Sequence, residues 1–243
     1  MGIPGVQFSR SVSREKPSLN TAASRPLPTS RLTQGYLICL AGTVILSTTA
    51  IFIRYLSERY RLTPLALAFW RDLFVAATLF ATLSLLRPSL LAQPRRDLKF
   101  LLLYGLELSL FNTLWTMSVY INGAAVATVL AYSSAAFTAL LGWRLMGERL
   151  GRAKALAVAL SLLGCAFVSG AYTASAWQVN TLGILVGLLT GLSYAGYSLI
   201  GRSASLRQMN PWSTLAYTFL FATLFLGLYN LAEGRLAIFG DSP

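Results

Sequence analysis

The sequence GYLICLAGTVILSTTAIFIR occupies residues 35–54 and contains no charge before its final residue, Arg54. The hydrocarbon core of a bilayer is about 30 Å thick, and about 20 residues cross it as a helix. Backbone groups in lipid must be paired within the segment, so an apolar stretch of this length favours a helix. We therefore predict that this stretch, extended to residue 56, spans a membrane.

Six further apolar windows of similar length follow along the chain. They lack the period-2 alternation that is typical of a β-barrel. The pattern predicts an all-α membrane protein with seven transmembrane helices, at residues 35–56, 64–86, 99–121, 124–146, 153–172, 181–201 and 212–232.

The composition argues against an ordinary soluble enzyme. Of the 243 residues, 55% are hydrophobic and 12% are charged, whereas an average soluble domain is about 25% charged. The chain has no His and only two Cys, which removes the commonest general base and the usual metal ligands. Phosphate loops, nucleophile elbows and the clustered acids of an intramembrane lipid enzyme are also missing from the sequence. We expect no cofactor, no metal and no enzymatic activity.

The basic residues predict an orientation. The chain has 20 Lys and Arg against 8 Asp and Glu, but they lie in short clusters between apolar runs, which indicates a membrane protein rather than a partner of nucleic acid. Fifteen of them fall in the N-terminal tail and in the second, fourth and sixth connections, and four fall on the other side. The positive-inside rule then predicts a multi-pass plasma-membrane protein with a cytoplasmic N-terminus. Residues 1–33, rich in Ser, Pro and Arg, are expected to form a disordered cytoplasmic tail.

After five spans the sequence pattern begins again. Gly35–Arg54 aligns with Gly183–Arg202 at an offset of 148 residues, and in both cases a polar loop and a proline precede the next apolar helix. Because five is an odd number of helices, the second unit would enter from the opposite side, as in the inverted repeats of many secondary transporters. The alternative is that apolar helices resemble one another by chance. The predicted units are a first five-helix repeat at 34–172 and a partial second repeat at 181–232.

Several motifs resemble the EamA-type transporters of the drug/metabolite transporter superfamily. LAYSSAAFTALL at 130–141, GERL at 147–150 and LLGCAFV at 162–168 are similar to the fourth and fifth helices of that family. Phe69-Trp70-Arg71 is similar to the start of its second helix, where an Arg follows an aromatic residue. The resemblance extends over about residues 35–232.

The resemblance implies ten helices in two inverted five-helix halves around a central cavity, with both termini in the cytoplasm. It also implies export or exchange of small organic metabolites, so the expected partners are a small organic solute and the lipid bilayer. This sequence has seven predicted helices, which suggests a C-terminally truncated member of the family. The alternative function is therefore a non-transporting membrane fragment or subunit that needs a partner chain, or a second copy, to complete a ten-helix bundle.

Charged residues inside a span are costly, so each is a candidate for function. Arg71 and Asp72 lie about seven residues into the second span, where Arg71 is expected to recognise charge or act as a gate, with Asp72 as its local partner. The alternatives are an Arg that extends to the membrane surface or one that pairs with an acid to join two helices. Glu107 lies in the middle of the third span, and it is either a proton-coupling acid or a structural partner of Arg71.

A polar arc follows the third span. By helical spacing Ser109, Asn112, Thr113 and Thr116 share one side of the helix, and Glu107 lies on the opposite side. This arc, with Trp115 beside it, is expected to contact an organic substrate; the alternative is hydrogen bonding between helices. The candidate residues of the substrate pathway are Arg71, Asp72, Glu107, Asn112, Thr113, Trp115 and Thr116.

A stripe of small residues marks the sixth span. Gly183, Gly187, Gly191 and Ala195 recur every four residues. Small residues at this spacing let two helices approach closely, so we predict a packing face there rather than a ligand site.

Overall fold

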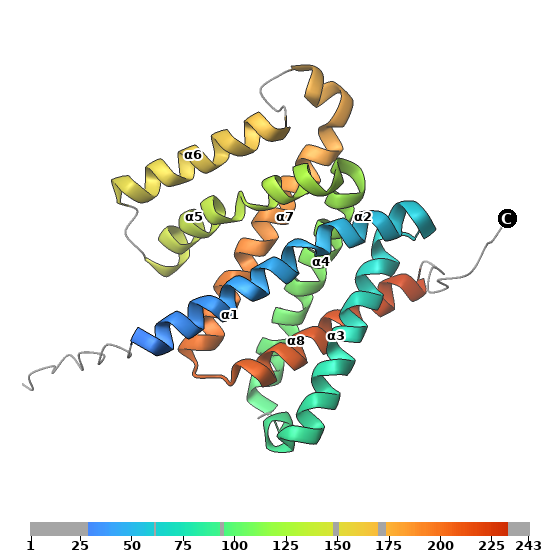
Figure 1. The fold of residues 1–243 in the computed structure, drawn as a ribbon, viewed down its shortest axis with the longest axis vertical. Helices are drawn as coiled ribbons and strands as arrows, with labels where there is room; N and C mark the ends of the chain where they lie inside the picture. Colours follow the sequence, from blue (N-terminus) through green and yellow to red (C-terminus); the bar gives the residue numbers. More distant parts are fainter. Residues whose placement is uncertain (1–28, 61, 93–94, 148–150, 170–173, 233–243) are drawn as a thin grey trace, which may run out of the picture. The chain divides into compact units, whose positions relative to one another are not determined.

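The computed structural model describes residues 29–60, 62–92, 95–147, 151–169 and 174–232. The chain divides into two compact units, residues 1–44 and 45–243, and every regular element in the described residues is helical (Figure 1). Residues 1–28 of the expected tail at 1–33 lie outside the described residues. The elements are α1 (Thr29–Ser47), α2 (Thr49–Tyr60), α3 (Pro64–Leu86), the 3-10 helix η1 (Pro88–Leu91), α4 (Arg95–Ala131), α5 (Ser134–Met146), α6 (Arg152–Ser169), α7 (Ala174–Leu206) and α8 (Pro211–Ala232).

Two predicted spans, 64–86 and 212–232, correspond to the single helices α3 and α8. Thr63 caps α3, because its Oγ1 accepts a hydrogen bond from the backbone N of Ala66 at 3.3 Å. Asn210 caps α8, because its Oδ1 accepts hydrogen bonds from the backbone N of Trp212 and of Ser213, at 3.0 and 3.4 Å. A proline follows each cap in the first helical turn, where its missing N–H leaves no bond unmade.

The predicted first span lies within one membrane-crossing stretch, Thr33–Tyr60, which a turn at Thr48 divides into α1 and α2. At Thr48 the backbone N–H and the side-chain hydroxyl both donate to the carbonyl of Ile45, at 3.2 and 2.7 Å. A hydroxyl that bonds to the preceding turn competes with the helical ladder, and residues 47–49 are three hydroxyl residues in succession. The first helix also begins earlier than predicted, since residues 29–33, assigned to the tail, are helical.

The predicted fourth span, 124–146, is divided as well. Helix α4 continues to Ala131 past one non-helical residue, Gly123, at φ 77° and ψ 164°. Glycine adopts this φ readily, and the guanidinium of Arg54 occupies the place where a Cβ would stand. Beyond α4 the hydroxyl of Ser133 donates to the carbonyl of Leu130 at 2.6 Å, and α5 follows with 13 residues. Helix α5 alone is therefore too short to cross a bilayer.

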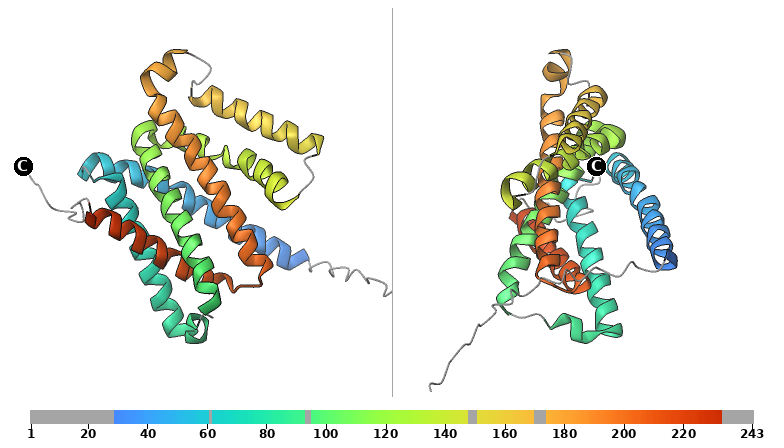
Figure 2. Two further views of the ribbon diagram at one scale, coloured as in Figure 1. Left: turned by 180° about the vertical axis from the view of Figure 1, so that it is seen from behind. Right: turned by 90° about the vertical axis from the view of Figure 1, so that its left-hand side faces the viewer.

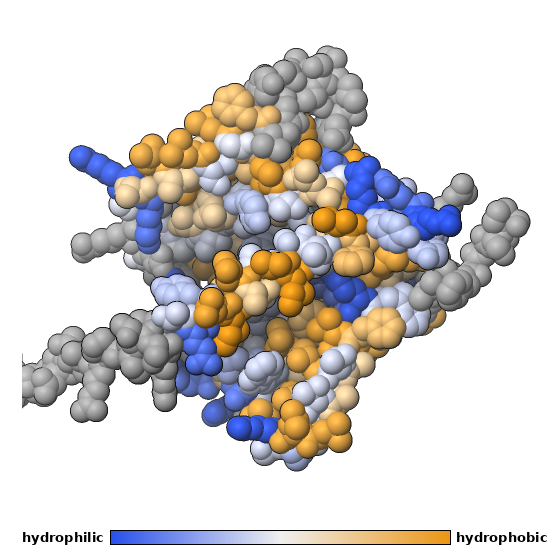
Figure 3. Space-filling view, in the orientation of Figure 1, coloured by the Kyte–Doolittle hydropathy of each residue, from blue (hydrophilic) through white to orange (hydrophobic). Residues whose placement is uncertain are grey.

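Five helical stretches within the described residues have the length and hydropathy to cross a membrane, against seven predicted spans. Large apolar side chains are exposed on them, among them Phe74 and Leu228, each 65% exposed, and Figure 3 shows such side chains at the surface. Lipid accommodates this exposure, whereas water would disfavour so much of it. The chain is a multi-pass helical membrane protein. The five stretches are Thr33–Tyr60, Pro64–Leu86, Arg96–Ala131, Thr181–Leu206 and Pro211–Ala232.

Within the second unit α4 packs against α7, α8, α3 and α2 (Figure 1, Figure 2). Helices α3 and α8 lie antiparallel, because Asn230 donates to the carbonyl of Leu65 at 3.3 Å near one end and the rings of Phe80 and Tyr217 lie 5.5 Å apart near the other. The small-residue stripe on α7 forms a packing face, as predicted. A Cβ built on Gly187 would meet Leu130, and one built on Gly191 would meet Ser133.

Candidate functional site

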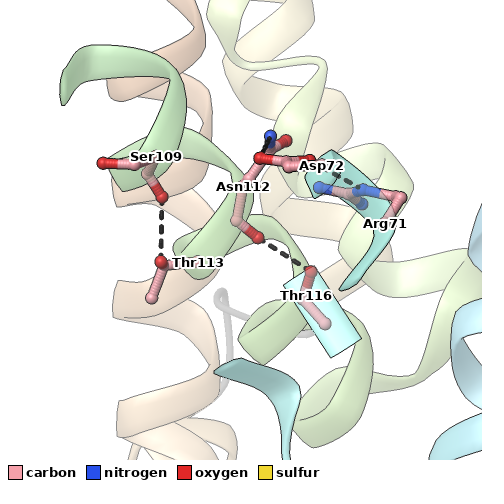
Figure 4. Close-up of polar contacts among 6 residues, drawn as sticks. All are labelled: Arg71, Asp72, Ser109, Asn112, Thr113 and Thr116. Atoms are coloured by element: carbon pink, nitrogen blue, oxygen red, sulfur yellow. Dashed lines mark hydrogen bonds and ion pairs between the residues drawn. The ribbon is translucent and has the colours of Figure 1, made fainter. Parts of the chain in front are cut away.

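A buried carboxylate joins α3 to α4. Asp72 on α3 has no exposed surface, and its Oδ2 accepts a hydrogen bond from Asn112 Nδ2 on α4 at 2.6 Å (Figure 4). Its Oδ1 accepts a hydrogen bond from Nε of the neighbouring Arg71 at 3.3 Å. Burying a carboxylate is costly unless it is paired and hydrogen-bonded. Both conditions are met here, because the acid has an amide partner across the helix interface and a cation beside it.

The guanidinium group of Arg71 is only partly hydrogen-bonded. Its side chain is 25% exposed, but Nη2 is buried and lacks a hydrogen-bond partner among the described residues. The same holds for Nε1 of Trp70, one residue earlier in α3. Buried polar atoms are nearly always bonded in native proteins. This turn of α3 therefore contains two buried N–H donors without a partner among the described residues, next to a carboxylate that is hydrogen-bonded on both oxygens.

Most of the predicted polar arc on α4 bonds within its own helix. The hydroxyls of Ser109, Thr113 and Thr116 donate to backbone carbonyls three or four residues earlier, at 2.7 to 2.8 Å. Figure 4 shows the bonds of Thr113 and Thr116. Such bonds satisfy a hydroxyl without linking it to another helix. Among these arc residues, Asn112 is the one with a side-chain bond to a second helix. The alternative that the arc forms hydrogen bonds between helices therefore holds for Asn112 and not for the other three arc residues.

Trp115 lies at the edge of the core rather than in the polar cluster. It packs against a group of buried apolar residues that joins α2 to α4. This placement gives the indole a packing function, although the ring is only partly buried. The group consists of Ala50, Ile53, Val119 and Ala127.

Glu107 faces a different helix from Asp72. Its Oε1 accepts a hydrogen bond from Ser193 Oγ on α7 at 2.9 Å, and a Cβ built on Gly196 would lie 2.9 Å from the same oxygen. The prediction that Glu107 and the arc point to opposite sides is confirmed, because Asn112 reaches α3 while Glu107 reaches α7. The prediction that Glu107 is the structural partner of Arg71 is wrong. The acid beside Arg71 is Asp72, its immediate neighbour.

Sequence reasoning missed the aromatic surroundings of Glu107. Tyr104 and Tyr197 have ring centroids 4.8 Å apart, and those of Phe111 and Tyr194 are 5.0 Å apart. The four rings come from α4 and α7, one turn before and after Glu107 on α4. A signal was present in the sequence, since Tyr194 and Tyr197 lie on either side of Ala195, the last position of the small-residue stripe in the sixth span.

Two cavities lie near this region but are not lined by the pathway candidates. One, of about 540 Å³, is lined by Tyr104, the end of α7 and the start of α8, including Thr214. The other, of about 350 Å³, lies between α5, α6 and α7, with Lys154 and Arg202 in its wall. No cluster of three or more His, Cys, Asp or Glu residues that could hold a metal occurs in the described part of the chain.

Comparison with known proteins identifies a family that the chain matches. Residues 33–170 match the model of the EamA-like transporter family. The uncharacterized transporter sll1319 of Synechocystis sp. is 27% identical over 136 residues, which are 54% of this chain and 41% of that protein. The uncharacterized transporter YwfM of Bacillus subtilis is 31% identical over 117 residues, 48% of this chain and 38% of that protein. The chain thus spans about two fifths of the length of these relatives, and no solved structure matches it.

Proposed function

Because the chain belongs to the EamA-like transporter family, we propose that it takes part in secondary transport, by export or exchange, of small organic metabolites across the plasma membrane. The observation that carries the proposal is the Arg71–Asp72–Asn112 cluster, whose carboxylate is buried at the α3–α4 interface of a multi-pass membrane protein. Ionisable groups inside membrane-spanning segments often mark solute and ion pathways. Two similar proteins are themselves named transporters.

The proposed mechanism is alternating access around a site near the membrane midplane. In it, residues 34–172 form one five-helix repeat, residues 181–232 begin an inverted second repeat, and the N-terminus faces the cytoplasm. The family match to residues 33–170 supports the first repeat boundary. The close approach of α7 to Leu130 and Ser133 supports a tight contact between the proposed repeats.

Glu107 is the proposed coupling acid. It reaches across an interface between the two proposed repeats, because Ser193 belongs to α7 and Glu107 to α4. No cation pairs with Glu107 among the described residues. A carboxyl group that gains and loses a proton there would alter its bond with Ser193, and so would link protonation to the fit of α4 against α7.

A second candidate function follows from the extent of the match. The chain aligns with 41% and 38% of its two relatives, so the alternative is a membrane subunit that transports nothing until a partner chain or a second copy completes the bundle. Neither proposal assigns an enzymatic reaction.

Reconstitution distinguishes the two candidates. The purified chain would be inserted into liposomes, and uptake of a radiolabelled panel of amino acids, organic acids and amines would be measured against concentration. Saturable flux supports transport by this chain. Absence of flux for the whole panel, together with a stable complex recovered from the native membrane, supports the subunit.

A further inference from the structure

The guanidinium of Arg71 is divided between two environments. Nε donates to Asp72 Oδ1 at 3.3 Å, whereas Nη2 is buried without a hydrogen-bond partner in the described part of the chain. Asp72 is itself fixed by Asn112 at 2.6 Å and has no exposed surface. The carboxylate therefore holds the Nε side of the guanidinium, and the Nη side is left to bind something else.

We propose that Arg71 Nη2 binds the carboxylate of a small organic acid, so that the transported solute is an organic anion. This inference rests on the proposed function and names its substrate class. Arginine N–H groups form short, strong bonds with carboxylates. Asp72, the carboxylate of the cluster, already accepts one hydrogen bond on each oxygen, from Asn112 and from Arg71, so its charge is engaged within the protein.

Trp70 supports the same assignment. Its Nε1 is a second buried donor without a partner among the described residues, one position before Arg71 in α3. Both of the buried polar atoms in this turn that lack a partner among the described residues are donors, which match the acceptor oxygens of an anion. Asp72 and Asn112 act as positioning residues, since they hold Arg71 and do not reach the solute.

The cluster can also exist without its ligand. Arg71 and Asp72 form an oppositely charged pair in the absence of solute, and such pairing is what allows two charges to stay inside a membrane. An isolated arginine at this depth would instead need a permanent counter-ion. The pair thus suits a site that alternates between an empty and an occupied state during transport.

The test measures ligand-induced stabilisation of the purified full chain in detergent. Acetate, succinate and benzoate are compared with acetamide, succinamide and benzamide, which keep the shape and lose the charge, and inorganic phosphate is a separate arm. A ligand that binds the folded state raises its thermal midpoint. We expect at least one carboxylate to raise the midpoint while its amide does not, and Arg71→Gln to weaken apparent binding by about tenfold or more.

A second variant covers the case in which Arg71→Gln leaves Asp72 unpaired and the protein fails to fold. The double variant R71Q/D72N removes both charges, so no buried carboxylate is left without a cation, and it must lose the carboxylate effect too. The inference is overturned if no carboxylate stabilises the wild type, if only phosphate does, or if R71Q/D72N responds as the wild type does.

Different results would overturn the proposal of transport and the assignment of an organic anion as the solute. Saturable flux of uncharged or cationic solutes that is equal in wild type and R71Q/D72N would leave transport standing and remove the anion assignment. Carboxylate binding that depends on Arg71, without flux of any solute, would leave the assignment standing and remove transport by this chain alone.

Discussion

Asn112 Nδ2 lies 2.6 Å from Asp72 Oδ2, so one hydrogen bond ties α4 to the buried acid of α3 (Figure 4). The hydroxyl residues nearby on α4 bond to their own helix. Asn112 is therefore the arc residue through which α4 contributes to the site, and it keeps the carboxylate in place to hold Arg71.

Replacing Asn112 with Leu should destabilise the protein. The change keeps a similar volume but leaves one carboxylate oxygen of Asp72 without its partner. We expect a loss of about 1.5–3 kcal/mol, as for hydrogen bonds to charged groups, above the average of roughly 0.6 kcal/mol for polar contacts between membrane helices. Unfolding of purified protein by SDS in mixed micelles would measure it.

The matched control is Thr113→Val on the same helix. The hydroxyl of Thr113 bonds to the carbonyl of Ser109 at 2.8 Å within the helix, so its loss should change stability by only a few tenths of that amount. Equal destabilisation by the two variants would contradict the special place given to Asn112.

Replacing Glu107 with Gln should uncouple transport from protons. Gln keeps an oxygen that can accept from Ser193 Oγ, but it cannot exchange a proton in the physiological range. We expect uptake driven by an imposed pH gradient to be lost while solute counterflow without a gradient persists. Vesicles that hold either variant or wild type would be compared for both activities.

Ser193→Ala is the control for the hydrogen bond itself. It removes the donor to Glu107 and keeps the carboxyl group, so proton coupling should survive. Proton-driven uptake that is unchanged in Glu107→Gln would remove Glu107 from the mechanism.

The hydropathy of the sequence predicted the helical class. It also predicted where α3 and α8 lie, and a proline after a capping residue marks the start of each of these two helices. It did not predict the breaks at Thr48 and at residues 132–133. Hydroxyl residues are common within membrane helices, and whether one bonds to the preceding turn depends on local geometry that hydropathy does not record.

Spacing along the sequence predicted which side of α4 each candidate residue lies on, but not the residue that it bonds to. Helical spacing correctly separated Glu107 from Asn112, because two positions on opposite sides of one helix face different neighbours. Spacing within one helix carries no information on which other helix is the neighbour. The pairing of Asp72 with Asn112, and of Glu107 with Ser193, therefore had to come from the structure.

The orientation of the chain can be read from single cysteines introduced into a background with Cys39→Ser and Cys165→Ser. The η1 connector lies beside the start of α8, because Ser213 Oγ and Tyr217 Oη donate to the carbonyls of Leu90 and Leu91, both at 2.6 Å. Ser89→Cys and Ser205→Cys should therefore be labelled from the same side of the membrane.

A cytoplasmic N-terminus predicts that this side is the inner one. A membrane-impermeant maleimide should label Ser89→Cys and Ser205→Cys only after permeabilisation, and Glu58→Cys in intact cells. Labelling of Ser89→Cys and Ser205→Cys from opposite sides would contradict the fold, and labelling of both in intact cells would reverse the orientation.

Gly191 offers a test of the contact between α7 and the turn before α5. A Cβ there would meet the hydroxyl of Ser133 and would lie 3.1 Å from the backbone N of Ser134. Backbone cannot move aside as a flexible side chain does, so Gly191→Ala should cost about 1–3 kcal/mol by overpacking. This cost exceeds the gain of up to about 1 kcal/mol that alanine brings to a helix.

Gly164→Ala is the matched control, because a Cβ on Gly164 in α6 meets nothing within 4 Å. It should leave stability unchanged or raise it. If Gly191→Ala is as stable as Gly164→Ala in SDS unfolding, the close approach of α7 to Ser133 is wrong, and with it the tight interface proposed between the two repeats.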